Sequence, residues 1–105
     1  MGEAILVQTT VPDEEKGREI ARVLIEARLA ACVKTAAPCV SLYRWEGRIV
    51  DDREWVLTIV TRRDLYPALE EKIRALHPYQ VPEIIALPVL EGNPDYLKWI
   101  EAETG

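Results

Sequence analysis

The stretch VSLYRWEGRIVDDREWVLTIVT, residues 40–61, decides the fold. Its second half, residues 48–61, contains no glycine or proline and is rich in Val, Ile, Thr and Trp, which predicts one continuous β-strand. At about 3.3 Å per residue such a strand would be roughly 45 Å long, more than twice the usual length. Glu46-Gly47 predicts a tight turn, so the first half should fold back as an antiparallel partner. We therefore expect a long β-ribbon that projects from the rest of the chain.

The predicted ribbon carries large apolar side chains around its turn, namely Tyr43, Trp45, Ile49 and Val50. A two-stranded ribbon is at best marginally stable in water on its own. The short helices expected elsewhere in the chain cannot reach these side chains, and an exposed apolar patch of this kind marks a contact with another molecule. We therefore expect something outside the single chain to cover the ribbon.

The composition limits the class of protein. The 105 residues suffice for a single domain, which we expect to span residues 1–105. The net charge of −5 disfavours nucleic acid as a partner, because phosphate binding needs a basic face. The chain has neither an apolar run of the ~20 residues that a membrane span needs nor a signal-sequence pattern, so we expect a soluble, cytoplasmic protein. Cys32 and Cys39 lack C-x-x-C spacing, and buried thiols are their simplest interpretation.

Outside the ribbon, the sequence alternates between strand and helix patterns. Residues 4–10 and 84–90 have the length and apolarity of strands, and another strand is expected from residues 29–33 onward, interrupted by Pro38. Asp13, Asp64 and Asn93 are expected to cap three helices. The side chains expected to be buried from these helices are Ile20, Ala21, Leu24 and Ala27, then Leu65, Leu69, Ile73 and Leu76, then Tyr96, Trp99 and Ile100.

This order of elements predicts an α+β fold, namely a ferredoxin-like βαββαβ sandwich with a long protruding β-ribbon and a C-terminal helix. In such a sheet the strands lie in the order fourth, first, third, second. The edge strands are then the two that contain Pro38 and Pro88. Proline is tolerated at an edge because it has no N–H to donate to a neighbouring strand.

Proteins of this fold class have many functions, so the residues of a site must decide between them. RNA-binding members need stacking aromatic residues on the third strand, where residues 53–61 read REWVLTIVT. A copper chaperone needs a C-x-x-C pair after the first strand, where residues 9–12 read TTVP. Both functions are therefore disfavoured.

Three further groups of residues have a functional and a simpler interpretation. Catalysis would depend on His77, the only histidine, but a cap at a helix end is the commoner role, so we predict no enzyme. The carboxylates of Asp51, Asp52 and Glu54 would hold a hard cation only if other oxygen ligands converge on them. The three tryptophans could mark a ligand pocket, although packing is their commoner role; they are Trp45, Trp55 and Trp99.

Four blocks of sequence resemble the CutA divalent-cation-tolerance family: RLAACV at 28–33, SLYRWEG at 41–47, HPYQVPE at 77–83 and GNPDYLKW at 92–99. Together with TTVPDE at 9–14, they cover nearly the whole chain in register. The resemblance implies a ferredoxin-like subunit, a tight homotrimer formed through the long strands, a cytoplasmic location and a role in tolerance of copper and other divalent metals. The family also resembles the PII signalling proteins in architecture, which implies a sensing role.

The resemblance also implies metal ligands. The copper ligands of the family look like a Cys at the end of the first strand and paired histidines before Pro-Tyr, positions that hold Thr9, Leu76 and His77 in this chain. His77 is therefore the first candidate ligand. Cys32 is the second, because a thiolate suits Cu(I), provided that the fold or a neighbouring subunit brings it near His77.

We therefore predict a non-enzymatic, homotrimeric divalent metal ion (copper) tolerance protein of CutA type that binds divalent cations weakly. No cofactor is required, and Cu or another divalent cation is the expected bound ion. The alternative is a PII-like sensor or signalling trimer with a small-molecule ligand in an intersubunit cleft. The expected partners are copies of the chain itself, divalent metal ions or a small molecule, without nucleic acid or a membrane.

Overall fold

The computed structural model describes residues 3–36 and 38–105. The strands of this part are β1 (Ala4–Val11), β2 (Cys32–Thr35), β3 (Cys39–Trp45), β4 (Arg48–Arg62) and β5 (Ile84–Pro88). The helices are α1 (Glu14–Glu26), α2 (Tyr66–Leu76), which follows the 3₁₀ turn η1 (Arg63–Leu65), and α3 (Pro94–Glu103). None of these helices is both long and apolar enough to span a membrane.

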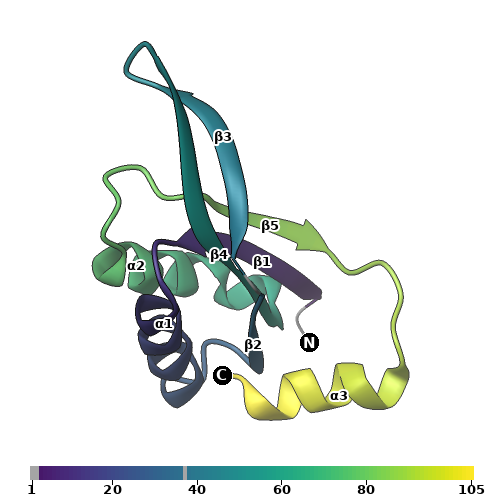
Figure 1. Ribbon diagram of the computed structural model, residues 1–105. Coiled ribbons are helices and arrows are strands. Elements are labelled where there is room, and N and C mark those ends of the chain that lie inside the picture. Colours follow the sequence, from purple (N-terminus) through teal and green to yellow (C-terminus); the bar gives the residue numbers. More distant parts are fainter. Residues whose placement is uncertain (1–2, 37) are drawn as a thin grey trace.

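The sheet is built around β4. The strand order is β2-β4-β1-β5, β3 pairs with the other end of β4, and every pair is antiparallel. This confirms the predicted order, with the first strand and the long strand in the centre. Figure 1 shows the β3-β4 ribbon rising well clear of the helices. The longest dimension of the described residues is 45 Å.

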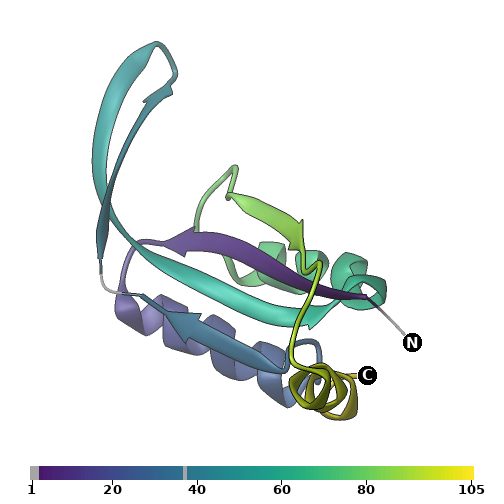
Figure 2. The same ribbon diagram turned by 90° about the vertical axis from the view of Figure 1, so that its right-hand side faces the viewer.

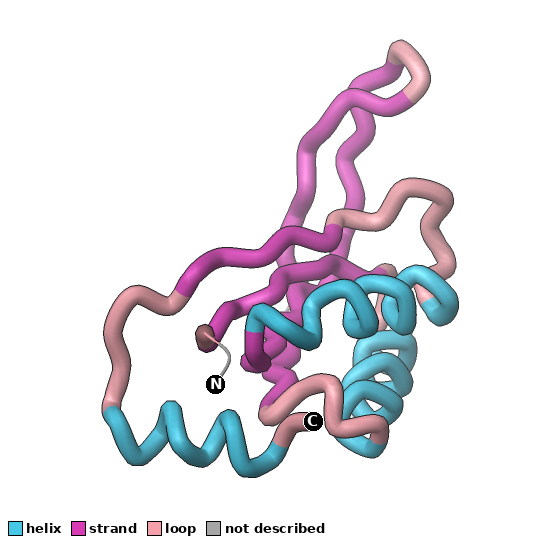
Figure 3. The backbone as a smooth tube through the Cα atoms, turned by 180° about the vertical axis from the view of Figure 1, so that it is seen from behind, coloured by secondary structure: helices cyan, strands magenta, loops and turns pink. Residues whose placement is uncertain are grey.

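The register of the strands gives the sheet two different faces. On one face Val7 and Thr9 of β1 lie opposite Ile59 and Leu57 of β4, and all four side chains are fully buried. The helices α1 and α2 cover this face (Figures 2 and 3) and complete the core with Ile20, Leu24, Leu69 and Ile73. The other face is more open. On β5, Ile85 and Leu87 each keep 49% of their surface exposed.

The first helix begins and packs as the sequence predicts. The Asp13 carboxylate accepts a hydrogen bond of 2.7 Å from the amide of Lys16, which satisfies one of the free N–H groups at the helix start. Glu14 and Arg18 form the expected pair one turn apart, at 3.0 Å. Gly17 lets the helix approach the sheet closely, because a Cβ there would lie 3.2 Å from the Leu57 side chain. These contacts fix α1 against the core face.

The ribbon also forms as predicted, with a two-residue turn. Trp45 pairs with Arg48, and the residues between them, Glu46 and Gly47, have φ angles of 50° and 80°. Positive φ at both central positions defines the type I′ turn, whose twist matches that of paired strands. β4 extends one residue beyond the expected strand, to Arg62, and is 15 residues long.

The second predicted strand is interrupted at Pro38 and its first part, β2, is an edge strand, both as expected. Pro38 itself lies between β2 and β3 rather than within a strand, and these two strands pair with different parts of β4. The predicted cap of α2 is wrong. Asp64 does not cap α2, because it lies inside η1, and the N-cap of α2 is Leu65, which makes no side-chain cap hydrogen bond. Pro67 lies in the first turn of α2, where its missing N–H has no helical partner to lose.

The C-terminal helix is capped as expected but packs less completely. Asn93 accepts a hydrogen bond of 2.9 Å from the amide of Asp95, and Ile100 is buried against the rest of the chain. Tyr96 and Trp99 stack on each other with ring centroids 5.5 Å apart, and each remains 41% exposed. Their predicted burial is therefore wrong within a single chain, since only one side of α3 packs inward.

Two buried threonines provide a matched test of the core. The Thr9 hydroxyl is buried without a hydrogen-bond partner, whereas that of Thr61 donates to the Leu29 carbonyl at 2.7 Å. We expect Thr9→Val to raise, and Thr61→Val to lower, the free energy of unfolding by about 1 kcal/mol each, because only the second substitution breaks a hydrogen bond. Thermal unfolding at a fixed protein concentration measures both. Shifts of the same sign in the two variants would contradict this assignment.

Candidate functional site

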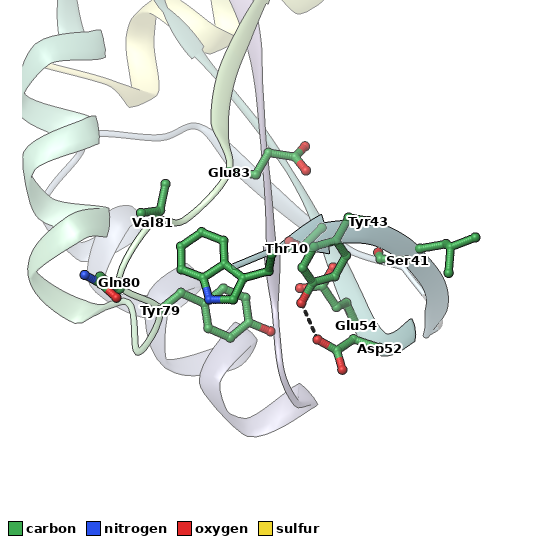
Figure 4. A pocket seen from close by; sticks show the side chains of 11 residues that line it. Thr10, Ser41, Tyr43, Asp52, Glu54, Tyr79, Gln80, Val81 and Glu83 are labelled. Atoms are coloured by element: carbon green, nitrogen blue, oxygen red, sulfur yellow. Dashed lines mark hydrogen bonds between the residues drawn. The ribbon is translucent and has the colours of Figure 1, made fainter. Parts of the chain in front are cut away.

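A pocket of about 700 Å³ lies between the β-ribbon and the segment that joins α2 to β5. The ribbon contributes Ser41, Leu42, Tyr43, Trp45, Asp52 and Glu54. The connecting segment contributes Tyr79, Gln80, Val81 and Glu83, and Thr10 closes the pocket at the end of β1. We refer to these residues together as the ribbon pocket (Figure 4).

The register of β3 and β4 turns the ribbon side chains toward this pocket. Ser41 lies opposite Asp52, and Tyr43 lies two residues further along β3, so all three share one face of the ribbon with Glu54. The Tyr43 hydroxyl donates a hydrogen bond to the Asp52 carboxylate. This bond, with the nearby negative charge, raises the pKa of Tyr43 to about 12, so the phenol keeps its proton at neutral pH.

The segment after α2 supplies the opposite wall. Tyr79 points from this segment toward the Tyr43 and Asp52 side chains of the ribbon (Figure 4). Burial raises the pKa of the Tyr79 phenol, and the neighbouring Glu54 carboxylate raises it further. Both phenols therefore keep their protons at neutral pH beside carboxylates.

His77 is held by the backbone at both ring nitrogens. Its Nε2 lies 2.7 Å from the Thr10 carbonyl oxygen, which can only accept, so Nε2 carries the proton. Its Nδ1 accepts a hydrogen bond of 3.2 Å from the amide of Tyr79. Burial lowers the pKa of His77, and the opposing effects of the Thr10 carbonyl and the Glu54 charge do not outweigh it. The neutral ring therefore ties the connecting segment to the end of β1.

Cys32 lies in a different part of the sheet. It pairs with Val60 on one side of β4, whereas Thr10, the partner of His77, pairs with Val56 on the other side. Four residues along β4 correspond to about 13 Å, so the two candidate metal ligands do not meet within one chain. Among residues 3–36 and 38–105, no three His, Cys, Asp or Glu side chains converge as a metal site.

The other two positions implied by the family resemblance hold core residues rather than metal ligands. Thr9 is fully buried in the core, and Leu76 packs against the same core. Neither supplies a nitrogen or sulfur ligand beside His77. Metal binding at His77 would have to displace the Tyr79 amide from Nδ1, because the other nitrogen carries a proton.

The sequence predicts only some of the residues that line the ribbon pocket. The sequence groups the carboxylates of Asp51, Asp52 and Glu54, but Asp51 lies on the other face of β4, opposite Leu42. The alternation of side chains along a strand could have separated them. Tyr79 and Glu83 were not connected to the ribbon, because their approach depends on how the segment after α2 folds.

The tryptophans have three different environments. Trp45 lines the ribbon pocket, as the functional interpretation required. Trp55 packs against the core cluster, whereas Trp99 lies on the exposed side of α3. Packing within the chain is therefore confirmed for Trp55, and packing of Trp45 or Trp99 at an interface stays a prediction.

The fold and the site define an α+β protein whose antiparallel sheet extends into a ribbon that borders an acidic, aromatic pocket. The family described as CutA1 divalent ion tolerance protein matches residues 5–103. The chain is 50% identical, over the full length of both chains, to the divalent-cation tolerance protein CutA of Thermus thermophilus. It is 48% identical to Protein CutA of Mus musculus over 90% of this chain and 54% of that protein. This chain belongs to the CutA1 family.

Solved structures agree with this assignment. The divalent cation tolerance protein Cut A1 of Thermus thermophilus superimposes with a TM-score of 0.95 at 49% identity, covering 97% of this chain and 99% of that chain. CutA1 from Oryza sativa gives a TM-score of 0.96 at 43% identity, covering 99% and 95%. The names of the family and of its Thermus thermophilus relatives describe tolerance of divalent ions rather than catalysis, and they give no support to the alternative of a PII-like sensor.

The buried imidazole predicts a pH-dependent stability. Because the pKa of His77 is lower in the folded protein, the unfolded chain takes up a proton first as the pH falls below about 6.5. The free energy of unfolding should therefore decrease from pH 7.5 to 5.5, and this slope should be shallower in His77→Gln. Chemical denaturation at several pH values measures this slope. The carboxylates contribute equally to both proteins, so the difference between the slopes reports His77. Equal slopes would show that His77 does not contribute.

Proposed function

We propose that this chain is a homotrimeric, non-enzymatic divalent-cation tolerance protein of CutA type that binds copper or another divalent cation weakly. The observation that carries the proposal is the match to the CutA1 family over residues 5–103, together with relatives of the same fold named for this tolerance. Residues 1–105 are proposed to form one ferredoxin-like domain. A cytoplasmic location is part of the proposal, and the free thiols of Cys32 and Cys39 fit a reducing compartment.

The surface of the ribbon supports the homotrimer. On the ribbon face opposite Tyr43 and Asp52, Val40, Ile49 and Leu42, which also borders the edge of the ribbon pocket, are each more than 60% exposed. Near the open sheet face, Ile85 and Leu87 of the edge strand β5 are also uncovered. Exposed apolar strands promote association, and a closed ring of subunits satisfies them without open-ended growth.

A substitution on the ribbon tests this assembly. We expect wild-type protein to sediment as a trimer and Ile49→Asp to shift the equilibrium toward monomer, because burying this side chain is worth about 2 kcal/mol and a buried charge adds a further cost. Sedimentation equilibrium measures both. Ile25→Asp is the control, since Ile25 is an exposed apolar residue of α1, away from the ribbon. A monomeric wild type at micromolar concentration would contradict the proposal.

His77 and Cys32 are the proposed metal ligands, and their positions set what binding requires. His77 must exchange the Tyr79 amide for the ion at Nδ1, which keeps the affinity low. His77 and Cys32 can share one ion only if they come from different subunits, because they are far apart in one chain. A site between subunits would be consistent with a function that depends on the trimer.

Calorimetric titration with Cu²⁺ and Zn²⁺ tests the ligands. We expect weak binding to wild type at pH 7.5 and weaker binding to His77→Gln and to Cys32→Ser. If the two residues share an ion, the double variant should lose no more affinity than either single variant, since one missing ligand already opens the site. Cys39→Ser is the matched control for loss of a thiol. Unchanged affinity in His77→Gln would remove His77 from the site.

A further inference from the structure

The side chains that line the ribbon pocket are negatively charged, and the proposed metal tolerance does not explain this charge. Its lining includes the carboxyl groups of Asp52, Glu54 and Glu83 and contains no lysine, arginine or histidine. Glu83 is held in place by Gln8, whose side-chain amide donates a hydrogen bond of 2.8 Å to it. The pocket is therefore suited to a cation rather than to an anion or a neutral molecule.

The burial of Glu54 is stronger support for a bound cation than the number of carboxylates is. Its side chain borders the pocket, yet the residue is only 6% exposed. None of the ion pairs formed by the described residues includes it. A buried carboxylate without a cationic partner is costly, and a positively charged ligand in the pocket would offset that cost.

The aromatic rings in the pocket favour an organic cation over a small metal ion. Tyr43, Trp45 and Tyr79 line the same pocket as the carboxylates. Aromatic faces attract ammonium and other organic cations, and they also pack against methylene groups. They provide no ligand atoms for a small metal ion, which needs several converging oxygen, nitrogen or sulfur atoms.

The spacing of the carboxylates favours more than one positive charge in the ligand. Asp52 and Glu54 are two residues apart on one face of β4, so their Cα atoms are about 7 Å apart. Glu83 approaches from the other side of β1, just before the start of β5. A cavity of about 700 Å³ is far larger than a single ammonium group needs.

We propose that the ribbon pocket binds a linear aliphatic polyamine, with its ammonium groups at the carboxylates and its methylene chain against the aromatic rings. Glu54 binds one ammonium group in the buried part of the pocket, and Asp52, oriented by the Tyr43 hydroxyl, binds the next. Neither His77 nor Cys32 lines this site, although His77 holds the backbone amide of Tyr79, which does. The site depends neither on metal binding nor on the proposed tolerance function.

Titration of the intact protein with 1,4-diaminobutane tests the proposal. We expect saturable binding that weakens with salt, binding of 1-aminobutane at least about tenfold weaker, and no binding of 1,4-butanediol, because each lost ammonium group removes a charge-assisted hydrogen bond. Tryptophan fluorescence gives a second readout. Trp45 is the only tryptophan among the lining residues, so the fluorescence change should be lost in Trp45→Phe.

The matched variants are Glu54→Gln in the pocket and Asp51→Asn on the opposite face of the same strand. Each removes one negative charge, but only Glu54→Gln should lower the affinity for the diamine by about tenfold or more. Asp52→Asn provides a second pocket variant, so the test holds even if Glu54→Gln weakens folding. Sedimentation of every variant shows whether its assembly still matches wild type.

Three results would overturn the proposal. Equal loss of affinity in Asp51→Asn and Glu54→Gln, or equal binding of Mg²⁺ at the same concentration, would show general attraction to an acidic protein. Absence of diamine binding to wild type would also overturn it, including the case in which a neighbouring copy fills the pocket with its own cationic side chain. In that case Glu54→Gln would weaken the assembly instead of ligand binding.

Discussion

The continuous pairing of β4 is the constraint on which the rest of the structure depends. From Trp55 to Arg62 this strand pairs with β1, and from Arg48 to Glu54 it pairs with β3. One uninterrupted backbone is therefore both the centre of the sheet and half of the ribbon. A break near Glu54 would uncouple the ribbon from the sheet, and the pocket walls supplied by β4 and by the segment after α2 would no longer have a fixed separation.

The sequence predicted the features that depend on local chemistry. The long strand, the Glu46-Gly47 turn and the Asp13 cap follow from composition, positive φ and a hydrogen bond three residues away. The strand order followed from the sequence of elements, and Pro88 on the edge strand β5 agrees with it. Family resemblance, rather than any single motif, indicated the CutA1 family.

The features that could not be predicted depend on contacts between distant segments. Tyr79 and Glu54 are 25 positions apart, and their proximity results from the way the segment after α2 returns toward the ribbon. Leu65 rather than Asp64 precedes α2, because an extra 3₁₀ turn forms after β4. The exposure of Tyr96 and Trp99 depends on which side of α3 meets the rest of the chain, which helical spacing alone does not determine.

His77 shows why a residue type alone does not define a site. An imidazole suggests a ligand or a catalyst, but here both nitrogens bind backbone groups, one on β1 and one on the segment that lines the pocket. This pair of hydrogen bonds positions Tyr79 beside Glu54, so His77 contributes to the shape of the ribbon pocket without lining it. Its buried, neutral state supports that role, because a charged ring could not accept the Tyr79 amide at Nδ1.

Two features of this chain would attract cations, and they differ in selectivity. Its net charge of −5 attracts every cation and is screened by salt, so it cannot distinguish one ion from another. Selectivity requires either converging ligand atoms at metal distances or a pocket shaped for a larger ion. Within the described residues one chain lacks the first arrangement, whereas the ribbon pocket combines carboxylates with aromatic rings. A metal site built from the described residues would therefore need ligands brought together from more than one copy of the chain, whereas the ribbon pocket of one chain fits the organic cation proposed for it.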